Sequence, residues 1–271
     1  MSKRILIASI SLALMATNLF AGGHCAADKT LTEGKFTIAT GNPAYFPWVL
    51  DDAPESGKGF EAAVAYAVAK EMGFAEQDVV WVRSSFDEAI QPGVKNFDIN
   101  MQQYSITAER DQVVDFSVPY YTAPMAVLVG AGAADTKPTI AALKGLKWGA
   151  VGSTTAVQKI ANVVQPNADP LLYGDNADVN AAITANQIDG AMFDLPTALF
   201  LSAVMIEGSK VIGQFPPETS DNADQFGMLM EEGNPLKACV DAALTAMIEN
   251  GTLASIEAQW LQDTTGVPLI K

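Results

Sequence analysis

Short apolar segments alternate with longer amphipathic segments along most of the 271 residues, and this alternation restricts the fold more than any other feature. Strands are expected at residues 36–40, 79–82, 97–101, 125–129, 147–151 and 190–193. Helices are expected at residues 59–72, 154–164 and 179–186, with Gly73 ending the first of them. Repeated alternation of this kind predicts parallel sheets with helices on both faces.

The apolar segments 125–129 and 226–230 suggest how the chain is divided. They are separated by about a hundred residues with their own strand-helix alternation, and the second is followed by helical patterns to the C-terminal end. If both segments cross between two lobes, lobe 2 (125–227) is an insertion within lobe 1 (28–124 and 228–271). The pattern also allows a continuous split into two domains near residue 130.

The first residues have the anatomy of a secretory signal peptide. A short basic start precedes an apolar stretch at 5–15 and small residues at 21–23. A membrane anchor is the alternative, but polar residues interrupt the apolar stretch, and spanning a bilayer takes about 20 apolar residues. We therefore expect residues 1–27 to be a signal peptide, cleaved after Gly23 or Ala27, and the protein to be exported to an oxidising compartment.

The few cysteine and histidine residues exclude several kinds of site. Cys25 lies at the end of the expected signal, and His24 before it does not suit lipidation. Cys239 would then be alone within an apolar helical pattern, which predicts a small thiol in the core. His24 is the single histidine. Without it, Ser-His and Cys-His catalytic sites and His-ligated zinc are excluded. We expect no metal and no cofactor.

The charge of the chain argues against nucleic acid as a partner. Lys and Arg total 16 against 31 Asp and Glu, giving a net charge of −15, and no basic run reverses this balance. Such a chain is repelled by a phosphate backbone. No glycine-rich phosphate-binding loop is present either. The remaining classes are binding proteins and enzymes that use carboxylate or lysine chemistry.

Six motifs occur in the order and spacing of a known family. The most specific is SITAERDQVVDFSVPYY at 105–121. The others are GFE opening the first helix, FDIN, LKGLKWGAVGSTT, DGAMFDLPTAL and ENGTLASIEAQW. From about Lys35 to Trp260 the chain thereby resembles the periplasmic amino-acid-binding proteins of ABC importers, solute-binding protein family 3.

This resemblance implies a type II periplasmic binding fold. The fold has two lobes, each a mainly parallel sheet flanked by helices, joined by two hinge strands. It further implies a periplasmic monomer without enzymatic activity, which closes on an L-amino acid and delivers it to a membrane permease.

The resemblance assigns the binding of the α-carboxylate and the ammonium group of the ligand to residues from both lobes. Arg110 offers a planar fork for the carboxylate, Ser105 adds a hydroxyl, and Gln103 adds a contact from the same loop. Taken alone, Arg110 reads as an ordinary surface arginine. In lobe 2, Thr154 and Thr155 open a helix whose free N–H groups attract an anion. Asp194 follows a strand at the position that takes the ammonium group.

Four residues are expected around the side chain of the ligand: Asn42, Tyr45, Trp48 and Phe86. Tyr45 and Phe86 would form opposing aromatic walls, whereas Trp48 suits the core equally well. Relatives that bind cationic amino acids tend to carry aspartate where this chain has Asn42. A buried cation would lack a partner there, although Asp51 and Asp52 could partly compensate. We therefore predict a neutral L-amino acid.

A periplasmic cyclohexadienyl dehydratase acting on arogenate or prephenate is the alternative on the same fold. This chemistry needs a carboxyl group as general acid. Glu61 is a weak candidate, because its place at the helix start suits local hydrogen bonding better. A receptor sensor domain lacks support, because no transmembrane or signalling segment follows Trp260.

Overall fold

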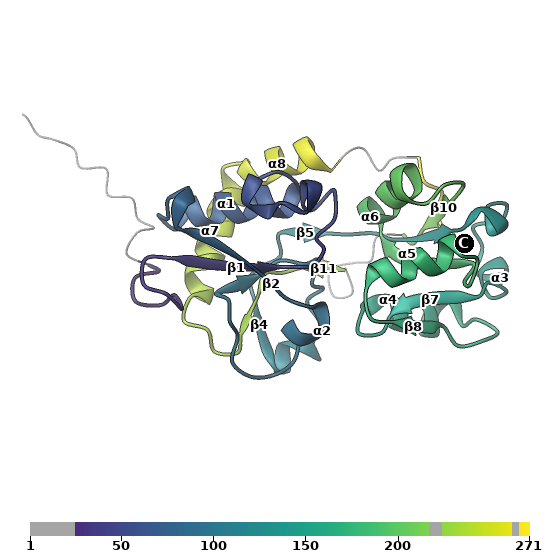
Figure 1. Ribbon diagram of the computed structural model, residues 1–271, viewed down its shortest axis with the longest axis horizontal. Coiled ribbons are helices and arrows are strands. Elements are labelled where there is room, and N and C mark those ends of the chain that lie inside the picture. Colours follow the sequence, from purple (N-terminus) through teal and green to yellow (C-terminus); the bar gives the residue numbers. More distant parts are fainter. Residues whose placement is uncertain (1–24, 217–223, 262–265) are drawn as a thin grey trace, which may run out of the picture.

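The computed structural model describes residues 25–216, 224–261 and 266–271, and the signal expected at 1–27 lies almost entirely outside these ranges. Two lobes lie side by side along the long axis (Figure 1), each built on a five-stranded sheet flanked by helices. In the described part of the chain, no helix has the length and apolarity needed to cross a membrane.

Lobe 1 contains the sheet β2-β1-β3-β12-β4, with β1 Phe36–Thr40, β2 Val79–Arg83, β3 Ile99–Asn100, β4 Val114–Phe116 and β12 Leu229–Glu231. Its helices are α1 Phe60–Glu71, α2 Phe86–Ala89, α7 Lys237–Glu249 and α8 Thr252–Trp260. Phe60, Val64 and Val68 recur every four residues along α1 and are fully buried. This apolar stripe is the reason why α1 packs against α7 and α8.

Lobe 2 contains the sheet β10-β6-β9-β7-β8, with β6 Met125–Val129, β7 Trp148–Val151, β8 Leu171–Tyr173, β9 Gly190–Asp194 and β10 Lys210–Gln214. Its helices are α3 Ile140–Leu143, α4 Thr155–Lys159, α5 Asn176–Thr184 and α6 Leu195–Phe200; π-helical turns Ile160–Val164 and Leu201–Met205 extend α4 and α6. Successive residues of β6 belong to separate cores on its two faces. Burial on both faces explains its continuous apolar sequence.

Short 3₁₀ turns occupy Leu50–Asp52, Pro54–Ser56, Glu76–Asp78, Arg110–Gln112 and Ala131–Ala133. Strands β4, β8 and β10 are additions to the elements expected from the sequence. Both sheets are mixed, because β12 in lobe 1 and β6 in lobe 2 run antiparallel to their neighbours.

The chain passes between the lobes through strands β5, Tyr121–Thr122, and β11, Gln225–Phe226, which pair antiparallel. Both are visible in the narrow connection between the lobes (Figure 1). The sequence placed the first crossover at 125–129 and the second at 226–230. These crossovers instead precede β6 and β12, because both of those strands belong to the sheets of the lobes.

The C-terminal residues differ from the expected division, in which 228–271 belong to lobe 1. Leu269 forms a parallel bridge with Gln214 of β10, and Ile270 is buried in a lobe 2 core. The amide of Ile140 donates to the carbonyl of Lys271 at 2.9 Å. The end of the chain therefore extends the edge of the lobe 2 sheet (Figure 1).

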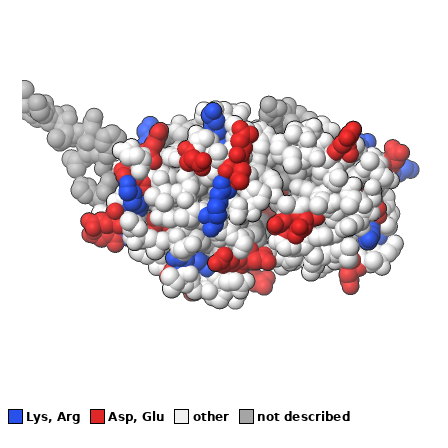
Figure 2. Space-filling view, viewed as in Figure 1, with Lys and Arg blue, Asp and Glu red and all other residues white. Residues whose placement is uncertain are grey.

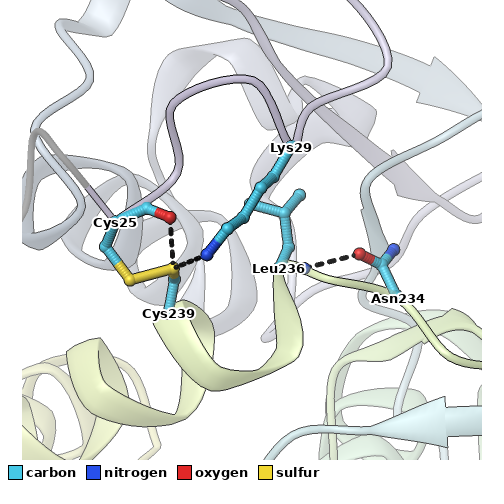
Figure 3. The surroundings of a disulfide bond; sticks show 5 residues. All are labelled: Cys25, Lys29, Asn234, Leu236 and Cys239. Atoms are coloured by element: carbon cyan, nitrogen blue, oxygen red, sulfur yellow. Dashed lines mark hydrogen bonds between the residues drawn. A yellow bond between two sulfur atoms is a disulfide. The ribbon is translucent and has the colours of Figure 1, made fainter.

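A disulfide joins Cys25 to Cys239 across a sequence separation of 214 residues (Figure 3). The prediction that Cys239 is a free thiol in the core is therefore wrong, although the residue is buried as expected, with 2% of its surface exposed. Ala26 is buried beside the bond, and Lys29 Nζ lies 3.6 Å from Cys239 Sγ. The pairing was missed because Cys25 was assigned to a segment that is removed or loose.

Candidate functional site

A cavity of about 230 Å³ lies between the two lobes. This is slightly below the roughly 300–1,000 Å³ of typical ligand pockets, so the occupant is small. Every site residue expected from the sequence lines it: Asn42, Tyr45, Trp48, Phe86, Gln103, Ser105, Arg110, Thr154, Thr155 and Asp194. The fold therefore brings these residues from five separate chain segments, 42–48, 86, 103–110, 154–155 and 194, into one cavity.

Arg110 is buried, with 8% of its surface exposed. It begins a 3₁₀ turn, and its backbone amide donates a hydrogen bond to Thr107 Oγ1 at 3.2 Å. Nη1 donates to the carbonyl of Ser105 at 2.8 Å, and the guanidinium carbon lies 5.4 Å from the centre of the Phe86 ring. Burial lowers the pKa of Arg110, but a guanidinium stays charged in proteins. The result is a fixed positive charge in the cavity wall.

Contacts between the lobes surround the cavity. Nη2 of Arg110 donates to the carbonyl of Ser153 at 2.9 Å, and the hydroxyls of Ser105 and Thr155 lie 3.4 Å apart. Thr155 is the first residue of α4, and Thr154 precedes it with its hydroxyl donating to the carbonyl of Val151. The Thr154 hydroxyl is therefore occupied within lobe 2, and the Thr155 hydroxyl is the one directed across the cleft.

Asp194 ends β9 and caps α6, where its Oδ1 accepts the amide of Thr197 at 2.8 Å. Burial raises its pKa to about 6, against the lowering effect of the hydrogen bonds from Thr197. The carboxyl is still mostly ionised at pH 7. The cavity is therefore lined by a negative charge from lobe 2, at Asp194, and by a positive charge from lobe 1, at Arg110.

Trp48 is buried in the core and also forms part of the cavity wall. It is 1% exposed and packs edge-on against Phe60, Tyr121 and Phe226, yet it also lines the cavity. Its Nε1 donates to the hydroxyl of Thr197 in lobe 2 at 2.8 Å. Trp48 is thus a core residue of lobe 1 that also holds the lobes together.

The remaining wall combines aromatic and polar groups. Phe86 stacks on Tyr104 with ring centres 4.5 Å apart. Tyr45 has a raised pKa, mainly because of burial and secondly because of the charge of Asp175. Asn42 adds an amide. This end of the cavity can contact a bound molecule that has both an apolar part and a polar end group.

Glu61 lies behind the cavity wall. It is 1% exposed and accepts hydrogen bonds from the amide of Gln103 at 2.8 Å, the side chain of Gln103 and the hydroxyl of Tyr120. Burial raises the pKa of Glu61 to about 7, although its hydrogen bonds act to lower it. Gln103 has a φ of +53°, so Glu61 holds the loop in a conformation that non-glycine residues adopt rarely.

The sequence profile of the bacterial extracellular solute-binding proteins, family 3, matches residues 37–263. This match covers most of the chain. The protein belongs to this family.

Similar proteins agree with this family in fold and length. The solute-binding protein is 25% identical over 265 residues to an L-arginine-binding protein of Pseudomonas aeruginosa, covering 96% of each chain. It superposes on an ancestral arginine-binding protein bound to glutamine with a TM-score of 0.71, at 26% identity, covering 86% of this chain and 100% of that one.

A third similar structure is an ancestral amino acid-binding protein described as a precursor of cyclohexadienyl dehydratase. Its TM-score is 0.68 at 26% identity, and the match covers 84% of this chain and 96% of that one. These structures share the type II periplasmic binding fold, so the two-lobed architecture expected from the sequence is confirmed.

Sequence reasoning missed two charged residues that line the cavity of this solute-binding protein, Asp175 and Asp224. Asp175 is exposed, whereas Asp224 accepts a hydrogen bond from Thr155 Oγ1 to its Oδ2 at 3.4 Å. Burial raises the pKa of Asp224, whereas the Ser105 hydroxyl and the charge of Arg110 lower it. Asp224 lies two residues before the apolar segment 226–230, and nothing in the local sequence distinguishes it from a loop acid.

The surface of the solute-binding protein has no broad basic area on the face shown in Figure 2, where Lys and Arg are scattered among acidic side chains. Among the described residues, no group of three or more His, Cys, Asp or Glu could hold a metal ion.

Proposed function

We propose that this solute-binding protein captures a single L-amino acid between its lobes and delivers it to an ABC permease. The observation that carries the proposal is that Arg110 of lobe 1 and Asp194 of lobe 2 line one small cavity with opposite charges. In a free amino acid, the ammonium group and the carboxylate are attached to the same α-carbon. Because the two charges are so close together, the ligand can contact both residues only when the lobes are closed. Ligand binding then favours the closed state.

In the proposed pose, the α-carboxylate contacts Arg110, Ser105 and the start of α4 at Thr155. Arginine suits a carboxylate because its planar fork donates two parallel hydrogen bonds. The ammonium group contacts Asp194. Oδ1 of that carboxyl accepts the amide of Thr197 at 2.8 Å, which holds the carboxyl at the cavity wall.

The surroundings of Asn42 support a neutral side chain on the ligand. Asp52, which could have replaced the missing aspartate, forms an ion pair with Arg83 and accepts the amide of Ala44 at 2.8 Å. Its charge is therefore already balanced. Asp175 lines the same end, but it is exposed and caps α5 by accepting the amide of Asp178. The similarity to an L-arginine-binding protein favours a cationic ligand instead. The ancestral arginine-binding protein bound to glutamine, however, is an example of a neutral ligand in this fold.

Binding without catalysis is the function that the site favours. A dehydratase needs a carboxyl group that reaches its substrate, whereas Glu61 is not among the residues lining the cavity, and its oxygens accept hydrogen bonds from Gln103 and Tyr120. We expect arogenate and prephenate to be left unconverted.

We further propose a periplasmic monomer, in agreement with the signal-like N-terminal sequence. The disulfide requires Cys25 in the mature chain. Of the two cleavage positions expected, the one after Gly23 meets this requirement, and the one after Ala27 does not. A disulfide-bonded Cys25 also has no thiol available for lipidation.

Calorimetric titration of ligand-stripped protein with the L-amino acids, led by L-glutamine and L-arginine, tests the proposal. We expect micromolar or tighter binding of a neutral amino acid. Arg110→Ala should lose at least about a hundredfold in affinity, because truncating one partner of a buried charge-assisted contact costs about 3 kcal/mol or more. Asp111→Asn, an exposed neighbour, is the matched control and should bind as wild type. Unchanged affinity in Arg110→Ala would refute the pose, and binding of arginine but not glutamine would refute the neutral ligand.

A further inference from the structure

The cavity contains a carboxylate that the proposed pose does not use. Asp224 lies with Ser105, Arg110 and Thr155 in the cavity wall. It accepts a hydrogen bond from Thr155 Oγ1 at 3.4 Å and another from the Ser105 hydroxyl, and the charge of Arg110 acts on it. These three groups are the ones that the pose assigns to the α-carboxylate of the ligand. Asp224 and the ligand therefore call for the same partners.

The backbone keeps Asp224 in this place. The residue directly precedes β11 in a crossover between the lobes. Its carbonyl accepts the amide of Ala123 from the other crossover at 2.9 Å, and the next carbonyl, of Gln225, accepts the amide of Ile106 at 2.8 Å. Asp224 is thus tied to both crossovers and to the loop that carries Ser105. These contacts keep Asp224 near Ser105 and Arg110 of lobe 1.

Arg110 cannot serve two carboxylates equally well. Two of its donors already bind the carbonyls of Ser105 and Ser153, and a guanidinium has five N–H groups in total. Two carboxylates held beside one another in a buried site repel each other strongly. Lys159 adds positive charge near Asp224, and Asp194 adds negative charge. Asp224 and the α-carboxylate of the ligand therefore do not occupy the same subsite together.

We propose that Asp224 is a built-in competitor that occupies the carboxylate subsite until the α-carboxylate of the ligand displaces it. The inference rests on the proposed function. On this inference, Asp224 lowers the affinity for the amino acid, because each binding event must break the contacts of Asp224 with Ser105 and Thr155. Affinity is thereby held below what Arg110 and Asp194 could supply alone, which favours release of the ligand to the permease.

Asp224→Asn tests the proposal, because asparagine keeps the shape and an acceptor oxygen but removes the charge. Wild type and variant are titrated with L-glutamine and L-arginine and with the corresponding amino-acid amides, which lack the α-carboxylate. We expect the variant to bind the better amino acid about tenfold more tightly or more, with no comparable gain for its amide. Asp178→Asn removes the same charge from an exposed position of α5 outside the cavity and should leave affinity within about twofold of wild type.

Equal or weaker binding of the amino acid by Asp224→Asn, with wild type binding normally, would overturn the inference and leave the proposed function intact. An equal gain for the amide would also overturn it, because the competition would then not involve the α-carboxylate. Binding by the variant alone would support it strongly. If neither protein bound any of the common L-amino acids, the proposed function would fail, and this inference with it.

Discussion

Removing the disulfide is expected to destabilise the protein by about 3 to 5 kcal/mol. The bond closes a loop with a sequence separation of 214 residues. The loss of chain entropy in the unfolded state gives about 5 kcal/mol for a loop of this length, and measured values for single disulfides are commonly about 2 to 4 kcal/mol. Since 1 kcal/mol shifts Tm by about 2–4 °C in a protein of this size, Tm should fall by about 10 °C.

The perturbation is the double variant Cys25→Ala and Cys239→Ala. Alanine is preferred to serine because Cys239 is 2% exposed, and a buried hydroxyl without a partner would add its own penalty. Thermal and urea unfolding are measured for wild type and variant, each with and without reductant. Reduced wild type should approach the double variant, and the variant itself should not respond to reductant.

The reasoning would be refuted if oxidised wild type and the double variant had the same Tm, or if the intact mass of wild type showed two free thiols. Amino-acid affinity serves as the control for an intact site. Cys239 lies on α7, and neither cysteine is among the residues that line the cavity, so affinity should change by less than about twofold below the transition.

Three further predictions concern buried groups of the site. Glu61 keeps a proton in the folded state between about pH 4.5 and 7 that the unfolded chain has lost, so the free energy of unfolding should fall by about 3 kcal/mol as pH rises through this window, and Glu61→Gln should remove that slope. Asp194 must be ionised to hold an ammonium group, so affinity should fall as pH drops below about 6, by about tenfold per unit, until the ligand is too weakly bound to titrate. Trp48→Phe removes the hydrogen bond to Thr197 between the lobes and should weaken amino-acid binding about fivefold.

Each of these has its own contrary outcome. A flat difference in Tm between wild type and Glu61→Gln from pH 5 to 8 would show that Glu61 is ionised throughout. Equal affinity at pH 5 and 7 would remove Asp194 from the ammonium site. For Trp48, equal amino-acid affinity of Trp48→Phe and wild type would show that the hydrogen bond to Thr197 does not contribute to closure of the lobes.

The sequence predicted the strands, the helices and the residues that line the cavity better than the contacts between residues that are distant in the chain. Strands such as β6 were recognisable because a strand buried on both faces is apolar throughout. Arg110 and Asp194, which line the cavity, were assigned through motifs of the family to which the chain belongs. Asp224 has no such signal, because its importance depends on Ser105 and Thr155 lying beside it in space.

The disulfide was missed for a related reason. Cys25 follows a signal-like segment, and sequence separation gives no indication that it reaches Cys239. The crossovers were displaced by a few residues because β5 and β11 are two residues long, too short for a period-2 pattern. Local patterns thus fix strands and helices, while contacts between distant segments need the fold.

The insertion of β12 between β3 and β4 has a consequence for the order of assembly. The lobe 2 sheet is built from residues 125–214, a continuous stretch that can pair as soon as it is available. The lobe 1 sheet lacks an interior strand until residues 229–231 arrive, and such non-local pairing is slow. Until then, β3 and β4 each have an unpaired edge, and such edges are sites of aggregation. The cavity is lined by residues up to Phe226, so an amino acid can stabilise only a chain in which residues 224–231 have already taken their places.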